Sequence, residues 1–308
     1  MYDLIIAGGG PAGVSAGIYA ARKKIKTLLI TDSFGGQSIV SADIQNFIGL
    51  KSVSGFELAK MMEEHLRAQE GIDIIDNDLV ATAEKINGGF KVTTQKNQAF
   101  ETKALLICSG SHRRKLKVPG EKEFDGKGVA YCSTCDAPLF KDKIVAVVGG
   151  GNAGLEATID LLSYAKKVYI LQRSEALKGD LVTREKIEKD PRVEVITLAE
   201  TTEILGNEFV TSLRYKDSRS GEAKELKLDG VFVEVGSEPN SDFVKSLVKL
   251  NDYKEIIVDH KTQQSSLPGI WAAGDVCDVL YKQNNISMGD AVKAVLNIYN
   301  YLNGNSRK

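Results

Sequence analysis

Apolar and polar positions alternate along this 308-residue chain in blocks that predict buried strands and helices in turn. Residues 2–7 and 27–31 are short apolar runs typical of buried strands. A predicted helix that is uncharged up to its last residue, Arg22, joins them. The same order recurs around the apolar runs 144–148 and 167–171. A strand, a helix and a second strand predict a βαβ unit, so the pattern predicts an α/β fold with two such units.

The remaining segments predict further elements around these units. Residues 56–69 have apolar positions at helical spacing, whereas 33–54 are rich in Gly, Gln, Asn and Ser and predict a long loop. Apolar runs predict short strands of a small sheet at 72–75, 81–86 and 90–94, buried strands at 104–108, 228–236 and 269–275, and a final helix at 289–302.

A glycine-rich turn follows the first strand of each unit. Gly8, Gly10 and Gly13 form the pattern G-x-G-x-x-G between a predicted strand and a predicted helix. The first two glycines allow a tight turn and the close approach of a pyrophosphate, and the third lets helix and strand pack closely. Residues 149–154 repeat the pattern. Two such turns in one chain predict two bound nucleotides with electron transfer between them.

Charged residues at the end of each unit's second strand help to predict which nucleotide the unit binds. Asp32 lies 19 residues after Gly13, where an acid that binds a ribose hydroxyl is expected, although a solvated loop residue is an equal interpretation. Arg173 lies 19 residues after Gly154, and Lys178 follows. An arginine here favours the 2′-phosphate of NADPH, and an ordinary surface arginine is the alternative.

Two cysteines separated by two residues, Cys132 and Cys135, stand between the two units and are followed by Asp136. A zinc ribbon needs two such pairs, and neither the other two cysteines nor the three histidines have ligand spacing around this one. A pair of core cysteines is the other alternative. With nucleotide turns on both sides, the pattern favours a redox-active pair.

Composition narrows the class of partner. The 40 Lys and Arg balance 41 Asp and Glu without a block of like charge, which argues against a nucleic-acid ligand. The uncharged stretch 4–21 contains several glycines and follows no basic segment, so it favours a strand, turn and helix over a membrane span or signal peptide. We therefore expect no membrane insertion and a cytoplasmic location.

Taken together, the motifs resemble those of the low-molecular-weight thioredoxin reductases, and even more the reductase portion of the flavoprotein subunit of alkyl hydroperoxide reductase. The resemblance runs nearly end to end and rests on Gly8-x-Gly10-x-x-Gly13, Gly35-Gly36-Gln37, Asn46, Cys132-x-x-Cys135-Asp136, Gly149-Gly150-Gly151-Asn152, Gly236-x-x-Pro239-Asn240, Ala273-Gly274-Asp275 and Tyr281-Lys282-Gln283.

The resemblance implies two Rossmann-like domains, the second inserted into the first. FAD would bind the discontinuous first domain, residues 1–113 and 242–308, and NAD(P)H the second domain, residues 114–241, which also carries the cysteine pair. The resemblance further implies a homodimer, a large domain rotation, and thioredoxin or another small CxxC disulfide protein as the partner.

Individual residues acquire expected roles in the same way. The catalytic residues would be Cys132, Cys135 and Asp136. The FAD contacts would be Gly8, Gly10, Pro11, Ala12, Gly13, Asp32, Gly36, Gln37, Asn46, Val80, Gly110, Gly274, Asp275, Lys282, Gln283 and Asn284. The pyridine nucleotide contacts would be Gly149, Gly151, Asn152, Gly154, Arg173 and Lys178.

The implied activity is that of a thioredoxin-disulfide reductase, with electrons passing from NADPH through FAD and the dithiol to the partner's disulfide. By analogy Cys135 faces the flavin and Cys132 attacks the partner. Asp136 is placed to handle the proton that thiol–disulfide exchange requires. Pro138, at an expected helix start, would put the pair near a helix N-terminus, which lowers a thiol pKa.

Three departures from the family pattern leave alternatives open. Gln172, Arg173, Ser174 and Lys178 stand where thioredoxin reductases usually carry His-Arg-Arg and a further Arg, and the hydroperoxide-linked relatives usually carry an acid near Gln172 and prefer NADH. Ala137 replaces the usual glycine, and the N-terminal disulfide-carrying domain of the hydroperoxide-linked protein is expected to be absent. An NADH- or ferredoxin-linked reductase of a peroxiredoxin system or glutaredoxin-like carrier is the first alternative. A non-catalytic flavin-bound redox sensor is the second.

Overall fold

The computed structural model describes residues 1–41 and 44–304, so two residues of the expected loop at 33–54 lie outside the described part. The chain divides into two compact units, Met1–His112 with Glu238–Lys308 and Arg113–Ser237. It passes between them at β7 (Ser111–Arg113) and β16 (Ser237–Pro239). The sequence had placed these two boundaries after residues 113 and 241.

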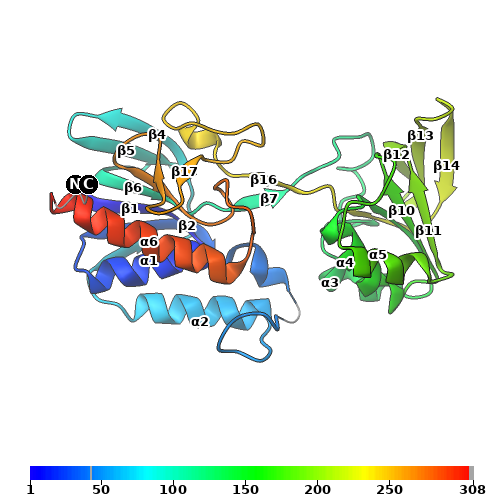
Figure 1. The fold of residues 1–308 in the computed structure, drawn as a ribbon, viewed down its shortest axis with the longest axis horizontal. Helices are drawn as coiled ribbons and strands as arrows, with labels where there is room; N and C mark the ends of the chain where they lie inside the picture. The colour runs from blue at the N-terminus through cyan, green and yellow to red at the C-terminus, as the bar shows by residue number, and fades with distance from the viewer. Residues whose placement is uncertain (42–43, 305–308) are drawn as a thin grey trace. The chain divides into compact units, whose positions relative to one another are not determined.

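A sheet with a parallel centre forms the middle of the first unit (Figure 1). Its strand order is β17-β18-β19-β6-β1-β2-β3, and the strands from β19 to β3 run parallel. The bounds are β1 (Tyr2–Gly9), β2 (Thr27–Phe34), β3 (Ile72–Ile75), β6 (Ala99–Ile107), β17 (Val258–Asp259), β18 (Gln264–Ser265) and β19 (Ile270–Ala272). An antiparallel hairpin of β4 (Val80–Ile86) and β5 (Gly89–Thr94) extends from β6.

Three helices pack beside this sheet: α1 (Pro11–Arg22), α2 (Gly55–Arg67) and α6 (Asn284–Leu302) (Figure 1). Two short 3₁₀ turns, η1 (Gly36–Val40) and η3 (Asp242–Val244), lie in the connections. A fully buried core that includes Leu4, Leu106, Trp271 and Val295 joins the sheet to α1 and α6. Because burial of such side chains is the main favourable term in folding, this core fixes the edge of the sheet where the nucleotide turn lies.

The second unit is a parallel sheet of order β11-β10-β9-β15-β8 with an antiparallel meander beside it. The sheet strands are β8 (Val129–Ala130), β9 (Ile144–Val148), β10 (Lys167–Gln172), β11 (Val193–Thr197) and β15 (Gly230–Val233). The meander strands are β12 (Ala199–Gly206), β13 (Val210–Asp217) and β14 (Ala223–Lys227). The helices are α3 (Ser133–Asp136), α4 (Asn152–Leu162) and α5 (Leu181–Glu188), and the 3₁₀ turn η2 (Ala137–Phe140) follows α3.

The predicted fold class, α/β with two Rossmann-like domains, is confirmed, and several element predictions are corrected. β3 belongs to the parallel sheet, paired with β2, and not to a small separate sheet. β6 begins at Ala99 and not at 104, because its first half alternates exposed and buried residues and lacks the apolar run of its second half. The last helix begins at Asn284, five residues before its predicted start at 289.

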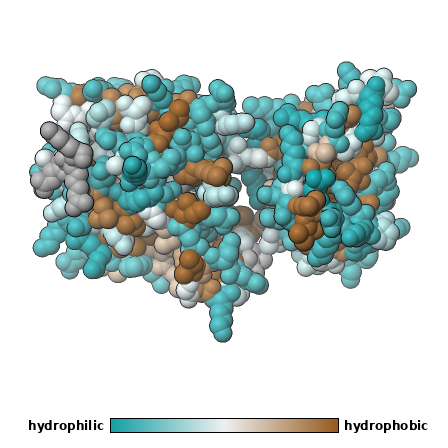
Figure 2. Space-filling model, viewed as in Figure 1, coloured by the Kyte–Doolittle hydropathy of each residue, from teal (hydrophilic) through white to brown (hydrophobic). Residues whose placement is uncertain are grey.

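The face of each unit that Figure 2 shows is largely hydrophilic, with hydrophobic side chains in scattered groups. Throughout 1–41 and 44–304, no helix combines the length and the apolar character needed to cross a bilayer.

Candidate functional site

The first glycine-rich turn joins β1 to α1 with almost no space for side chains. Gly8 has φ +119°, and a Cβ there would come within 2.3 Å of the Cys108 carbonyl oxygen. A Cβ on Gly13 would lie 1.8 Å from the Gly8 carbonyl oxygen, so strand and helix meet backbone to backbone. Gly10 caps α1 and Pro11 opens it. The first amides of α1 therefore have no partner within the helix and can bind an anion.

A cleft opens next to this turn, at the carboxyl ends of the parallel strands. Its lining comes from the turn, from the residues that follow β2, β6 and β19, and from the start of α6. The Gln37 amide Nε2 donates to the Ser111 carbonyl oxygen at 2.7 Å and to its hydroxyl at 2.9 Å, which joins two walls of the cleft. The expected FAD residues that line it are Gly8, Gly10, Pro11, Ala12, Gly36, Gln37, Gly110, Gly274, Asp275 and Asn284.

The other expected FAD residues lie outside this lining. Gly13 packs beneath the turn, Asp32 is exposed at the end of β2, and Val80 packs against the core at the start of β4. Asn46 donates from Nδ2 to Gln283 Oε1 at 3.2 Å, so these two residues, far apart in sequence, lie together. Lining residues that the sequence did not single out include Ser33, Ser38, Ser111 and Ser287.

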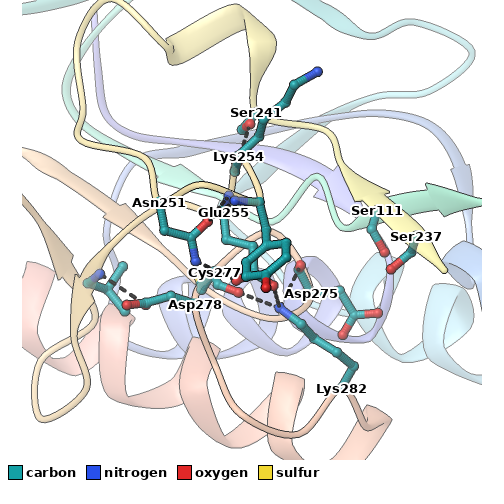
Figure 3. Close-up of polar contacts among 12 residues, drawn as sticks. Ser111, Ser237, Ser241, Asn251, Lys254, Glu255, Asp275, Cys277, Asp278 and Lys282 are labelled. Atoms are coloured by element: carbon teal, nitrogen blue, oxygen red, sulfur yellow. Dashed lines mark hydrogen bonds and ion pairs between the residues drawn. The ribbon is translucent and has the colours of Figure 1, made fainter. Parts of the chain in front are cut away.

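Lys282 lies outside the cleft lining and contacts the segment that carries Asp275, which is part of that lining (Figure 3). Its ammonium donates to the carbonyl oxygens of Asp275, at 3.1 Å, and Cys277, and pairs with Glu255 Oε1 at 2.8 Å. Asn251 Nδ2 in turn donates to Glu255 at 2.7 Å. Burial raises the pKa of Asp275, and the positive charge of Lys282 and a hydrogen bond from Ser287 oppose that rise.

These features fit FAD. The glycines leave the backbone bare where a pyrophosphate would approach, and the free amides of α1 face the same space. Ser38, Ser111 and Asp275 supply hydroxyl and carboxyl groups around it. The cleft thus offers an anion site and polar partners for the rest of a dinucleotide.

The second turn repeats the geometry of the first. Gly149 has φ +121° and a Cβ there would lie 2.1 Å from the Glu234 carbonyl oxygen, while a Cβ on Gly154 would lie 1.9 Å from the Gly149 carbonyl oxygen. Gly151 caps α4, whose first residue is Asn152. Asn152 Oδ1 accepts a hydrogen bond from the Asp180 amide at 2.7 Å, so its side chain holds the neighbouring loop. The turn and the N-terminus of α4 fit the pyrophosphate of NAD(P)H.

At the end of β10, the side chain of Gln172 is buried and that of Arg173 is exposed, so the two residues have different roles. Gln172 is buried, and its Oε1 accepts from the Gly150 amide at 3.1 Å while its Nε2 donates to Ser174 Oγ at 2.5 Å. Gln172 therefore belongs to the turn. Arg173 and Lys178 are exposed, and within the described residues neither side chain has an ion pair.

The cysteine pair forms a disulfide at the start of α3, in the second unit. Cys132 is the N-cap residue, and its Sγ accepts from the Cys135 amide at 3.3 Å. The helix thus starts at Ser133; Pro138 opens the following turn η2, not the helix that carries the pair, contrary to the sequence prediction. Cys132 is half-buried, Cys135 is exposed, and burial raises the pKa of Asp136.

Two carboxylates of the second unit were not found from sequence, and one of them lies beside the pair. Asp160 on α4 accepts hydrogen bonds from Ser133 and Thr134, the residues between the cysteines. Glu234, at the end of β15, is almost fully buried and pairs with Arg113 Nη1 at 2.6 Å. Glu234 could have been noticed because it is a carboxylate within the apolar end of a predicted strand. Asp160 could not have been found from sequence, because its contacts depend on how α3 packs against α4.

Two dinucleotide-type folds and a CxxC disulfide in one chain define a nucleotide-dependent disulfide oxidoreductase. The pyridine nucleotide-disulphide oxidoreductase family matches residues 2–295, and the chain belongs to it. It is therefore an oxidoreductase of a family whose members bind FAD and NAD(P)H, as the sequence predicted.

Individual relatives agree with the predicted resemblance. An alkyl hydroperoxide reductase component from Staphylococcus epidermidis is 41% identical over 301 residues, and its counterpart from Pseudomonas putida is 44% identical over 306. Both alignments cover 98% of this chain but only 59% and 58% of the relatives, so the chain spans about three fifths of their length. Thioredoxin reductase from Lactococcus lactis matches with TM-score 0.88 and 32% identity, covering 99% of this chain and 100% of its own. Thioredoxin reductase from T. acidophilum gives 0.84 and 37%, covering 97% and 98%.

Proposed function

We propose that the protein is a disulfide reductase that moves electrons from NADPH, through FAD and the Cys132–Cys135 pair, to the disulfide of thioredoxin or a thioredoxin-like protein. One observation carries this proposal. The Cys132–Cys135 disulfide sits at a helix start in the same unit as a dinucleotide turn, with Asp136 directly after it. The names of the relatives, thioredoxin reductases and alkyl hydroperoxide reductases, support a disulfide or peroxide-linked pathway.

The chemistry supplied by the cofactors is hydride transfer from NAD(P)H and two-electron transfer by FAD. In the proposed reaction the reduced Cys132 thiolate attacks one sulfur of the partner's disulfide, whose bond breaks as a mixed disulfide forms. Cys135 then attacks the Cys132 sulfur, which releases the partner as a dithiol and restores the Cys132–Cys135 disulfide. Each leaving thiolate needs a proton. Asp136, whose pKa is raised by burial, donates the first proton, then accepts the proton that Cys135 loses on attack and passes it to the second thiolate.

The position of the pair favours this chemistry. As N-cap of α3, Cys132 lies at the positive end of a short helix, where a thiolate is stabilised. The exposure of Cys135 and half-exposure of Cys132 leave sulfur accessible to a partner. The opposite order of attack, with Cys135 first, would appear as a mixed disulfide trapped by Cys132→Ser.

NADPH is the donor that the exposed charges favour. Arg173 and Lys178 stand beyond β10, on the side of the turn where a 2′-phosphate would lie. NADH is the second candidate, since Gln172 is neutral and the relatives named alkyl hydroperoxide reductase match closely in sequence. Anaerobic titration of the flavin with each nucleotide separates the two. Reduction by neither would point to another donor, such as ferredoxin.

The first unit carries a surface suited to a second copy of the chain. An apolar hollow of about 390 Å³ lies between α1, α2 and the segment 47–50, and Phe47, Leu58 and Met62 line it. Ile48 and Met61 also line the hollow, and they are 82% and 48% exposed. Large exposed apolar groups on one face typically mark a protein interface. We therefore propose a homodimer, which sedimentation of wild type and Ile48→Asp would test.

Turnover is the test of the whole proposal. The purified protein with FAD is mixed with NADPH and a panel of small CxxC disulfide proteins, and NADPH oxidation is followed. Loss of turnover in Cys132→Ser and Cys135→Ser, with flavin reduction by NADPH retained, supports the proposal. Flavin reduction without disulfide turnover in the wild type supports a redox sensor instead. We also place the protein in the cytoplasm, where Cys108 and Cys277, free and buried, stay reduced.

A further inference from the structure

The two residues between the cysteines are tied to one carboxylate. Ser133 Oγ donates to Asp160 Oδ2 at 2.8 Å, and Thr134 Oγ1 donates to the same oxygen at 3.3 Å. Ser133 follows Cys132 directly, and Thr134 precedes Cys135 directly. One carboxylate oxygen of Asp160, on α4, therefore accepts hydrogen bonds from both residues that connect Cys132 to Cys135.

This attachment matters because α3 is one turn long. A helix of four residues has no stability of its own, and its position depends on contacts to neighbouring elements. Asp160 lies eight residues after the start of α4, about two turns below the nucleotide turn. The hydroxyl contacts thus fix the cysteine pair to the same helix that begins at the predicted pyrophosphate site.

The surroundings of Asp160 are acidic. Glu156 lies one turn before it on α4, and Glu234 at the end of β15 is paired with Arg113 from β7. Asp160 and Glu156 both help to raise the pKa of Glu234, after the larger effect of its burial, so these charges act on one another through the unit. Arg113 is the one cation among these four side chains. These four side chains together carry a net negative charge, which would oppose the formation of a thiolate beside Asp160.

We propose that Asp160 is a positioning residue that holds the Cys132–Cys135 link in place and, through its charge, makes the dithiol a stronger reductant. The inference rests on the proposed function, since it concerns the same dithiol. Above the lower thiol pKa, reduction of the disulfide takes up two electrons and one proton and yields one thiol and one thiolate. A nearby negative charge destabilises this anionic product relative to the neutral disulfide, and the reduced pair gives up its electrons more readily.

The test compares two variants that each remove one negative charge from the second unit. Asp160→Asn keeps a side-chain oxygen that can accept from Ser133 and Thr134. Glu185→Gln is the matched control on α5, where Glu185 is exposed and pairs only loosely with Lys189 at 3.9 Å. Each holoenzyme is equilibrated anaerobically with glutathione buffers, and the reduced fraction of the Cys132–Cys135 pair is counted by thiol labelling and mass spectrometry.

For Asp160→Asn we expect the equilibrium constant for reduction by glutathione to rise about three- to tenfold, a shift of about 15–30 mV. The shift should shrink as the pH falls and the thiolate is lost. Glu185→Gln should match the wild type. An Asp160→Asn potential equal to that of Glu185→Gln, at every pH, overturns the proposal.

A second variant separates charge from attachment. Ser133→Ala with Thr134→Val removes both hydroxyls and leaves the Asp160 charge, so we expect slower exchange with a disulfide substrate and no rise in the equilibrium constant. A rise as large as that of Asp160→Asn would show that geometry, not charge, sets the potential, and would overturn the charge role. The equilibrium measurement needs neither pyridine nucleotide nor a protein partner, so failure of the proposed function, seen as absent turnover, is distinguishable from failure of this inference.

Discussion

The side chain of Gln172 closes the second nucleotide turn, because its Oε1 accepts a hydrogen bond from the Gly150 amide at 3.1 Å. A Cβ on Gly150 would lie 3.2 Å from the Gln172 side chain and 2.5 Å from that of Leu177, so there is no space for a side chain at residue 150. An acidic side chain at residue 172 would accept the same amide bond but would not donate to Ser174 or Ala176 as Gln172 does. We therefore expect the exposed residues that follow, Arg173 and Lys178, to decide whether a nucleotide with a 2′-phosphate is preferred.

Arg173→Ala is expected to raise the KM for NADPH about tenfold or more and to leave the KM for NADH nearly unchanged. The reason is the loss of a charge-assisted hydrogen bond to the 2′-phosphate, which NADH lacks. Steady-state kinetics with both nucleotides and one disulfide substrate measure the effect. Arg192→Ala is the control, since Arg192 lies in the same unit but pairs with Asp190. Equal losses for both nucleotides in Arg173→Ala would contradict the assignment.

Asp136→Asn is expected to lower the rate of disulfide turnover about a hundredfold, within the range typical of a lost general acid. Burial raises the pKa of Asp136, so the carboxyl stays protonated to higher pH than an ordinary aspartate. Wild-type turnover should therefore fall as the pH rises through that raised pKa, and the variant should lack this decline. A pH profile of kcat measures both. Asp142→Asn, an exposed position in the same unit, should keep the wild-type profile; an unchanged profile in Asp136→Asn would exclude the proton role.

The nucleotide turns could be predicted from sequence because the constraint is local. Gly8 has a positive φ, and Gly13 contacts the carbonyl oxygen of Gly8, five residues before it, so both glycines answer a constraint set within the turn. The strand and helix around them are largely apolar. Gly149 likewise has a positive φ, and Gly154 contacts the carbonyl oxygen of Gly149. Their spacing, together with the strand and helix pattern around them, therefore indicated the fold class.

The supporting contacts could not be predicted, because they join residues far apart in the chain. Lys282 meets Glu255, and Asp160 meets Ser133, only after the strands have assembled. Pro138 misled the prediction of the cysteine helix, since a proline tolerates the first turn of a helix and also the 3₁₀ turn where it lies. Side-chain capping by Cys132 set the helix start instead.

Lys282→Met is expected to weaken FAD binding about tenfold. The change removes the donor to the Asp275 and Cys277 carbonyl oxygens and leaves Glu255, which is mostly buried, without its cation, so the loop that carries Asp275 should loosen. Titration of the flavin-free protein with FAD measures the affinity. Lys245→Met, an exposed lysine of the same unit that pairs with Asp242 at 3.7 Å, is the control. Equal affinities in the two variants would show that Lys282 does not support the cleft.

Glu234 should make the stability of the second unit depend on pH. Burial raises its pKa from 4.5 to about 7, although the charge of Arg113 and its hydrogen bond to Glu234 oppose the rise. Between these two values the folded state holds a proton that the unfolded state has released. The contribution of Glu234 to the free energy of unfolding should therefore be largest below pH 4.5. It should fall by at most about 3 kcal/mol as the pH rises to about 7 and beyond.

Glu234→Gln is expected to remove this slope, because an amide does not ionise. Hydrogen exchange of the β9 and β15 amides, corrected for the intrinsic rate at pH 5 and pH 8, reports local unfolding of the sheet that carries Glu234. The wild type should lose protection at pH 8 relative to pH 5, and the variant should lose less. Glu185→Gln should behave like the wild type, because Glu185 is exposed. A wild type with equal or greater protection at pH 8 would mean that the Arg113 pairing outweighs burial, with Glu234 charged throughout this range.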